Sequence, residues 1–249
     1  MNPRTVIATA LTIAMLATVT MPARAAQHAS IDAAFNPEHL GAATTVSVAF
    51  RIAGVHATPA ALTGVSLEYP RNLGFATSGL GLASCRPVAL ETFGPSACPA
   101  NSLMGKGAAT VEVPIGPSLV REGVALSVFA GPSPDGYLHM LIYVNGVFPV
   151  SAQVVLSGVL LPGRISITLP PIPSLPEAPY VSVANMHLTL GGNLKYFETV
   201  HGRSVPYRPP GVGLPLTCPH RGFAFAATFE FLNGAHAGAH TAVPCPRQH

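Results

Sequence analysis

Hydrophobic and polar residues alternate at every second position along most of the chain. Val46, Val48, Phe50 and Ile52 share one face of the segment 44–53, and polar residues take the other face. A period of two is typical of a half-buried β-strand, because successive strand side chains point to opposite sides of a sheet. The same period recurs at about residues 65–69, 109–115, 124–128, 137–144, 150–157, 159–168 and 180–190.

Turn-forming residues separate these segments, whereas the periodicity of a long amphipathic helix is nearly absent. Short strands at regular spacing, punctuated by Gly and Pro, are typical of a sandwich or a barrel. The high content of both residues (Gly 24, Pro 26) agrees with many turns. The expected fold class is therefore all-β: an antiparallel β-sandwich of about ten strands with long Pro/Gly loops.

The C-terminal region predicts a β-hairpin with an aromatic face. Phenylalanines occupy alternate positions along the segment 223–231, and Asn233-Gly234 follows it. Asn-Gly is the preferred pair of a two-residue type I′ turn. That turn would place Phe231 opposite His236 and leave half-buried histidines beside the aromatic side chains.

Three segments break the alternation. Residues 72–102 are rich in Gly, Pro and Ser, with one or two helical turns expected from Pro87. Residues 169–180 read LPPIPSLPEAPY, and five prolines exclude a central strand. We expect this segment to be an extended linker lying against a sheet edge, with a docking strip for a proline-binding partner as the alternative. Residues 200–217 form the third loop.

The four cysteines predict two disulfides. Cys85, Cys98, Cys218 and Cys245 are even in number, and an exported chain meets an oxidising environment. Of the three possible pairings, Cys85–Cys98 and Cys218–Cys245 close the shortest loops and cost the least entropy. Each would stabilise the fold by about 3 kcal/mol. No C-x-x-C spacing supports a zinc site.

The N-terminal segment has the features of a secretory signal peptide. A charged start is followed by an apolar centre and by Ala23-Arg24-Ala25, which places small residues before a cut after Ala25. Residues 1–25 are the expected signal peptide, and residues 26–249 the secreted domain, with a division into two sub-sandwiches near 169–180 as the alternative. The expected location is extracellular or the cell envelope, with no transmembrane anchor after cleavage. The other interpretation, an uncleaved anchor, conflicts with a short apolar run.

Charge argues against nucleic-acid and membrane-surface partners. Only 9% of residues are charged, and the formal net charge of +3 falls by two to +1 when Arg4 and Arg24 leave with the signal peptide. Binding to phosphate backbones requires a basic patch, and binding to anionic lipid requires a polybasic segment. Neither is present in this sequence.

Three sequence patterns carry a resemblance to a family. They are Cys85…Cys98-Pro99-x-x-Ser102-x-x-Gly105-x-Gly107-x-Ala109, the proline segment running into VSVANMHLTLGG, and the ending TCP-x-x-G-F-x-F-x-A-T-F-x-F-x-N-G…PC. Together they cover most of residues 45–245, and they resemble an uncharacterised family of exported β-sandwich proteins from high-GC Gram-positive (actinobacterial) bacteria. The resemblance implies secretion, β structure and two local disulfides. It implies no activity.

Motifs for catalysis or cofactor binding are absent from the sequence. It contains no G-x-S-x-G, H-E-x-x-H, Walker A or Rossmann pattern, so no catalytic residue, metal ligand or cofactor is predicted. The mature chain has only Asp32 and Asp135 as aspartates, so a carboxylate pair would need glutamates such as Glu91 or Glu198.

The spacing of the histidines does not favour a metal site. His236 and His240 are four strand residues apart, about 13 Å, which is too far to share one ion. His139 shares a strand face with Tyr143, as His187 does with Asn185. Either pair could line a polar pocket, although an ordinary surface position is the simpler interpretation.

The expected function is that of a secreted, non-enzymatic β-sandwich that binds or supports a cell-envelope or extracellular component of unknown identity, and two alternatives stand beside this first function. The second is a carrier that holds a lipid or another apolar ligand. The third is a secreted hydrolase without a recognisable motif. An apolar cavity would favour the carrier, a pocket joining His and Glu would favour the hydrolase, and a solid core with polar faces would favour the module.

Overall fold

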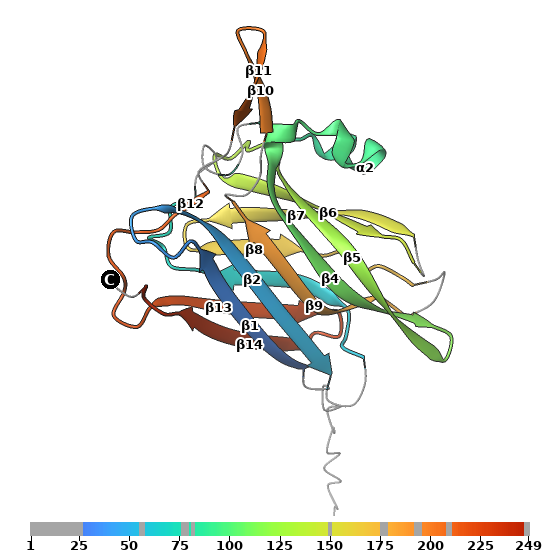
Figure 1. Cartoon of the computed structure of the whole chain (residues 1–249). Coiled ribbons are helices and arrows are strands. Elements are labelled where there is room, and N and C mark those ends of the chain that lie inside the picture. The colour runs from blue at the N-terminus through green and yellow to red at the C-terminus, as the bar shows by residue number, and fades with distance from the viewer. Residues whose placement is uncertain are drawn as a thin grey trace, which may run out of the picture.

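The computed structural model describes residues 27–54, 58–75, 80, 83–148, 151–174, 179–191, 196–207 and 211–246. The expected signal peptide, residues 1–25, lies outside the described residues. Antiparallel strands make up most of the described chain, which confirms the all-β prediction (Figure 1).

The strands are β1 (Gln27–Asn36), β2 (Ala43–Gly54), β3 (Leu62–Glu68), β4 (Leu103–Ile115), β5 (Ser118–Ala130), β6 (Leu138–Gly146), β7 (Ala152–Leu161), β8 (Arg164–Thr168), β9 (Ser182–Leu190), β10 (Tyr196–Val200), β11 (Arg203–Tyr207), β12 (Val212–Gly213), β13 (Phe223–Phe231) and β14 (His236–Val243). The helical elements are α2 (Pro87–Phe93) and two short 3-10 turns, η1 (Pro95–Ala97) and η2 (Ala100–Ser102).

Eleven strands form one hydrogen-bonded path. Its order is β1-β2-β9-β4-β5-β6-β7-β8-β3-β13-β14, with β12 paired to β2 beside the path. The first and last strands of the path, β1 and β14, lie side by side, so the sheet curls round and is nearly closed (Figure 1). The hairpin β10–β11 is a separate two-stranded sheet that projects from one end. Strand β11 lies within residues 200–217, so the prediction of a loop over that whole segment is wrong.

The inner face of the curled sheet holds the main core. Alternate residues of each strand point inward, and Phe223, Phe225 and Phe229 of β13 are almost fully buried. Phe35 meets Phe223 edge to face at 5.2 Å between ring centroids, so aromatic contacts join β1 to β13 across the interior. Edge-to-face geometry suits the charge distribution of aromatic rings and adds to the gain from burial.

The first disulfide fixes helix α2 on the outer face of the sheet. Cys85 and Cys98 are joined, and they flank the helix on both sides. Leu90, fully buried, points from the helix onto a small second core that contains Phe129, Leu141 and Tyr143. The helix begins with Pro87, as the sequence predicts, because proline suits the first helical turn.

The second disulfide joins Cys218 to Cys245 and brackets the terminal hairpin of β13 and β14. Both predicted pairings are therefore confirmed. The segments between the paired cysteines are short, so the two links constrain local regions rather than distant parts of the chain.

The turn of this hairpin differs from the prediction. Gly234 has a positive φ of 74° and ends a three-residue loop, in which its N–H donates to the Phe231 carbonyl. One extra residue in the turn shifts the register by one, so Glu230 lies opposite His236. The expected pairing of Phe231 with His236 is wrong, and the histidine is exposed on the outer face.

Among the described residues, no helix has the length and apolar character needed to cross a membrane.

A candidate apolar ligand-binding site

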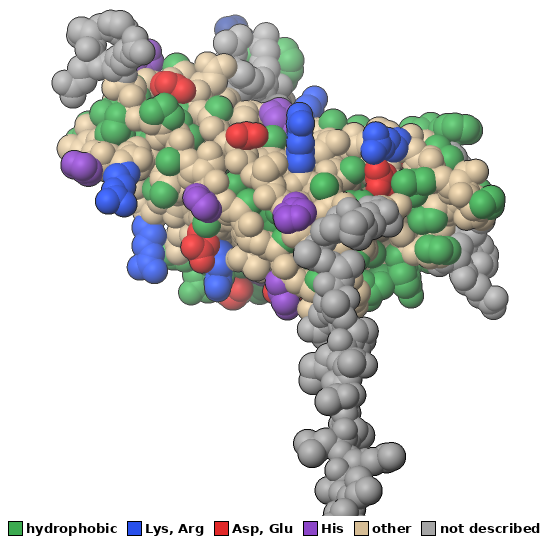
Figure 2. Space-filling view, turned by 90° about the horizontal axis from the view of Figure 1, so that it is seen from below, with side chains coloured by type: hydrophobic (Ala, Val, Ile, Leu, Met, Phe, Trp, Pro, Cys, Tyr) green, Lys and Arg blue, Asp and Glu red, His purple; other side chains and the backbone are tan. Residues whose placement is uncertain are grey.

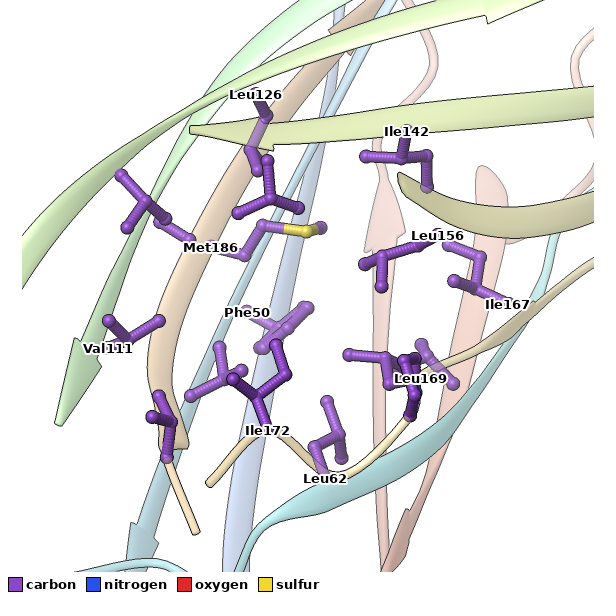
Figure 3. Close-up of a pocket in the computed structure, with 17 residues that line it drawn as sticks. Phe50, Leu62, Val111, Leu126, Ile142, Leu156, Ile167, Leu169, Ile172 and Met186 are labelled. Atoms are coloured by element: carbon purple, nitrogen blue, oxygen red, sulfur yellow. The ribbon is translucent and has the colours of Figure 1, made fainter. Parts of the chain in front are cut away.

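An apolar cavity lies inside the curled sheet. It has a volume of about 110 Å³, and 17 residues line it, all of them hydrophobic or proline. Figure 3 shows the side chains of Phe50, Leu126, Ile142, Leu156 and Met186 pointing towards one open centre from several strands. We call this cavity chamber one. Because no polar side chain of the described residues lines it, the chamber suits a hydrocarbon.

A second cavity, chamber two, extends deeper into the same interior. Its volume is about 50 Å³, and its lining is also almost wholly apolar. The polar exception is Tyr69, whose hydroxyl donates a hydrogen bond to the Leu161 carbonyl at 2.7 Å. The two chambers share four lining residues, which are Phe50, Val65, Ile167 and Met186.

The exposure of the inward side chains agrees with these cavities. Val48, Leu67 and Met186 point inward by strand alternation, yet each is only half-buried. Residues of the same face that lie away from the chambers, such as Met104 and Val113, are almost fully buried. In a tightly packed interior, all inward side chains would be buried to the same degree. The lower burial of those beside the chambers therefore agrees with unfilled space there.

The proline-rich segment covers one end of chamber one. Leu169, Pro170 and Ile172 line the chamber, and on the return of the segment Val181 does so too. The Leu169 N–H donates to the Thr63 carbonyl at 2.9 Å, and the Val181 N–H donates to the Ile172 carbonyl at 2.8 Å. The segment thus adds side chains to the chamber wall, which is more than the sheet-edge contact that the sequence suggested. Residues 175–178 lie outside the described residues.

A buried carboxylate lies at the same end of the sheet. Glu122 points inward from β5, one inward position before Val124 of the chamber wall, and is 5% exposed. Its Oε1 accepts a hydrogen bond from the Phe148 N–H at 3.0 Å. The neighbouring Phe148 side chain is 78% exposed, so this end combines one anchored turn with an exposed aromatic ring.

The outer face of β1, β2, β9, β4 and β5 carries a groove of about 930 Å³ that is lined by both polar and apolar residues. Asn185 and His187 line it together, as the sequence suggested they could, and Asp32 lies there too. Arg121 and Glu112, which also line the groove, form an ion pair in which Arg121 Nε lies 3.0 Å from Glu112 Oε1. Within the described part of the chain His187 makes no hydrogen bond to a carboxylate, so the groove holds no acid–base pair.

The other candidate residues lie apart from one another. Tyr143 is buried beneath α2, away from any pocket with His139. His139 instead meets Asp135 in an exposed turn, with Nε2 and Oδ1 2.8 Å apart, and this hydrogen bond lowers the pKa of Asp135. Glu91 is exposed on α2, and Glu198 belongs to strand β10 rather than to a loop.

The charged groups of the surface are dispersed. On the face seen in Figure 2, acidic, basic and histidine side chains are spread among neutral and hydrophobic ones, and some acidic side chains lie beside basic ones. No group of three or more His, Cys, Asp or Glu residues that could hold a metal ion occurs among the residues described.

Comparison with known proteins found no matching protein-family model, no matching curated protein and no matching solved structure.

Proposed function

We propose that the protein is a carrier that holds a lipid or another apolar ligand inside its curled sheet. The observation that carries the proposal is chamber one, a cavity of about 110 Å³ with a wholly apolar lining. Apolar cavities of about 150 Å³ stay dry and take up small apolar molecules, so water would not compete for this space. In this proposal the two halves of the sheet act as the facing layers of a sandwich.

The energetics of an unfilled interior support a resident ligand. An apolar void costs a protein about 24 cal/mol for each Å³, so one of about 110 Å³ costs about 2–3 kcal/mol. A ligand of matching shape would recover that amount. A structural role alone gives no reason for keeping such a void, because larger side chains at a few positions would fill it.

The other two functions have less support. An envelope-binding module would be favoured by a solid core, and the interior is not solid. A hydrolase would be favoured by a pocket that joins His and Glu, whereas the hydrogen-bonded histidine–carboxylate pair among the described residues, His139 and Asp135, is exposed in a turn. The two disulfides are compatible with a secreted carrier.

Native mass spectrometry of protein secreted by its host and purified without detergent tests the proposal. We expect an added mass that organic extraction releases and identifies as an apolar molecule. A bare chain from repeated preparations, which also takes up no hydrocarbon probe, would contradict the carrier and leave the envelope-binding module as the better hypothesis.

Ala109 offers a matched pair of variants for the same test. Ala109 points into chamber one, whereas its neighbour Ala108 points to the exposed outer face of the same strand. Ala109→Leu should fill part of the chamber and lower the bound fraction at least tenfold, with little loss of stability. Ala108→Leu should leave the bound fraction unchanged. Equal effects of the two substitutions would place the ligand outside the chamber.

A further inference from the structure

The border between the two chambers consists of four side chains of unequal mobility. Val65 and Ile167 are β-branched, and two heavy atoms on Cβ restrict rotation about χ1. Phe50 is held by an edge-to-face contact with Phe229, at 5.0 Å between ring centroids. Met186 has three rotatable side-chain bonds and a polarizable thioether, which lets methionine adapt to different surroundings.

The Met186 side chain has a small residue as its neighbour on one side. Its partners across the neighbouring strands are Phe50 on β2 and the small Ala109 on β4. The side chain is half-buried, and Figure 3 shows it reaching towards the centre of chamber one. Of the four border residues, Met186 is therefore the one whose rotamer can change most easily, without movement of the backbone.

The linings of the two chambers are almost wholly apolar. Chamber one has no polar side chain in its lining, and in chamber two the Tyr69 hydroxyl is already bonded to a backbone carbonyl. A polar group of a ligand would lose its hydrogen bonds to water in either chamber, at a cost that opposes binding. Among the described residues, it would gain none from the lining of chamber one, and in chamber two the only polar side chain is Tyr69, whose oxygen can accept one. Both chambers therefore favour hydrocarbon, and the polar group of a ligand is expected to stay outside them.

We propose that the ligand is an amphiphile with a single unbranched hydrocarbon chain, whose end passes Met186 and lies in chamber two. Met186 then determines how long a chain the protein accepts. This inference rests on the carrier function proposed above, and it adds the class of ligand and the residue that sets its length.

Contacts of the chain end in the wild-type protein give the first test. The probe is a straight-chain primary alcohol labelled with ¹³C at its terminal methyl. We expect nuclear Overhauser effects from this methyl to Ile31 and Ile165, which line chamber two and not chamber one. Effects confined to Leu126 and Ile142, which line chamber one alone, would overturn the inference while leaving the carrier function in place.

A series of primary alcohols of increasing length gives the second test. For the wild type, affinity should rise about fourfold with each added methylene, including lengths beyond those that chamber one holds. Met186→Phe should stop the rise at the length that fills chamber one. Met186→Ala should strengthen the binding of the long alcohols at least threefold relative to that of the short ones.

Met104→Ala is the matched control, because Met104 is fully buried and lines neither chamber. It should lower stability and keep the wild-type length profile. If Met186→Ala and Met104→Ala give the same profile, Met186 does not set the length. If no alcohol binds the wild type and no apolar molecule copurifies with it, the carrier function fails together with this inference.

Discussion

At the scale of single residues, the burial of Tyr69 makes the stability of the protein depend on pH in the alkaline range. The residue is 7% exposed, and its ring lies 4.7 Å from that of Phe75 at the border of chamber two. Burial raises the pKa of Tyr69, because a phenolate loses its hydration there. The neutral phenol also keeps its hydrogen bond to the Leu161 carbonyl.

The sign of the pH dependence follows from the raised pKa. Neutral Tyr69 contributes stability that is fully present below the unfolded-state pKa of about 10 and is lost as the pH rises through the folded-state value. In a spectroscopic titration Tyr69 should ionise at a higher pH than the ordinary value of a tyrosine. Tyr69→Phe should remove this late step and cost about 1 kcal/mol for the lost hydrogen bond. An unchanged titration curve would contradict this assignment.

The sequence identifies some functional residues and misses others for a physical reason. The cysteine pairs follow from loop length, and the shared strand face of Asn185 and His187 follows from alternation. Met186 and Glu122 carry no such signal, because a methionine or glutamate at an inward strand position looks ordinary. Their roles come from neighbours on other strands, and those neighbours are known only once the sheet has curled.

At the scale of elements, the turn between β6 and β7 is held from inside the sheet. The Glu122 carboxylate on β5 accepts a hydrogen bond from the Phe148 N–H, so one side chain ties the turn to the end of the interior. Gly146 leaves room for this carboxylate, since a Cβ there would lie 2.8 Å from Glu122 Oε1. The missing side chain at Gly146 thus leaves the space in which the Glu122 carboxylate can bond to the turn.

Glu122 should therefore control the order of this turn. Glu122→Gln keeps an acceptor oxygen and should lower stability by less than about 1 kcal/mol, whereas Glu122→Ala should cost about 1.5–3 kcal/mol, the range for hydrogen bonds to charged groups. Hydrogen exchange at the Phe148 amide should accelerate in the alanine variant and change little in the glutamine variant. Equal exchange in both would show that the turn is held by other contacts.

The elements also show where sequence patterns are sufficient. Strands β2, β4 and β13 appear where alternation of bulky residues predicts them. Strand β1 has the same alternation, but alanines take several of its positions, and alanine gives a weak strand signal. The register of the last hairpin depended on one residue of turn length, which Asn-Gly alone does not fix. The proline segment could be recognised as extended, but its contact with the cavity is a long-range property.

At the scale of the whole molecule, curling the sheet creates both the core and the chambers. The two ends of the strand path meet at β1 and β14, and the Cys218–Cys245 disulfide brackets the hairpin that brings β14 there. An inner face closed on itself leaves a central space whose filling depends on side-chain volume. Bulky phenylalanines of β13 fill one part, whereas smaller aliphatic residues elsewhere leave the chambers open.

Because one curled sheet encloses the core, unfolding should be one cooperative event. The proline segment at residues 169–180 is where two sub-sandwiches would meet, yet hydrogen bonds join the chain on both sides of it. β3 pairs with both β8 and β13, and β9 pairs with both β2 and β4, so neither side can unfold without exposing the core of the other.

Calorimetry with both disulfides intact should then show one transition, with equal calorimetric and van't Hoff enthalpies. A saturating straight-chain alcohol should move the whole transition upward, because a ligand that binds only the folded state stabilises every part of a cooperative unit. Two transitions, of which the alcohol moves only one, would instead indicate two sub-sandwiches. In that case the chambers would belong to one sub-sandwich, and stability measured far from them would no longer report on the ligand.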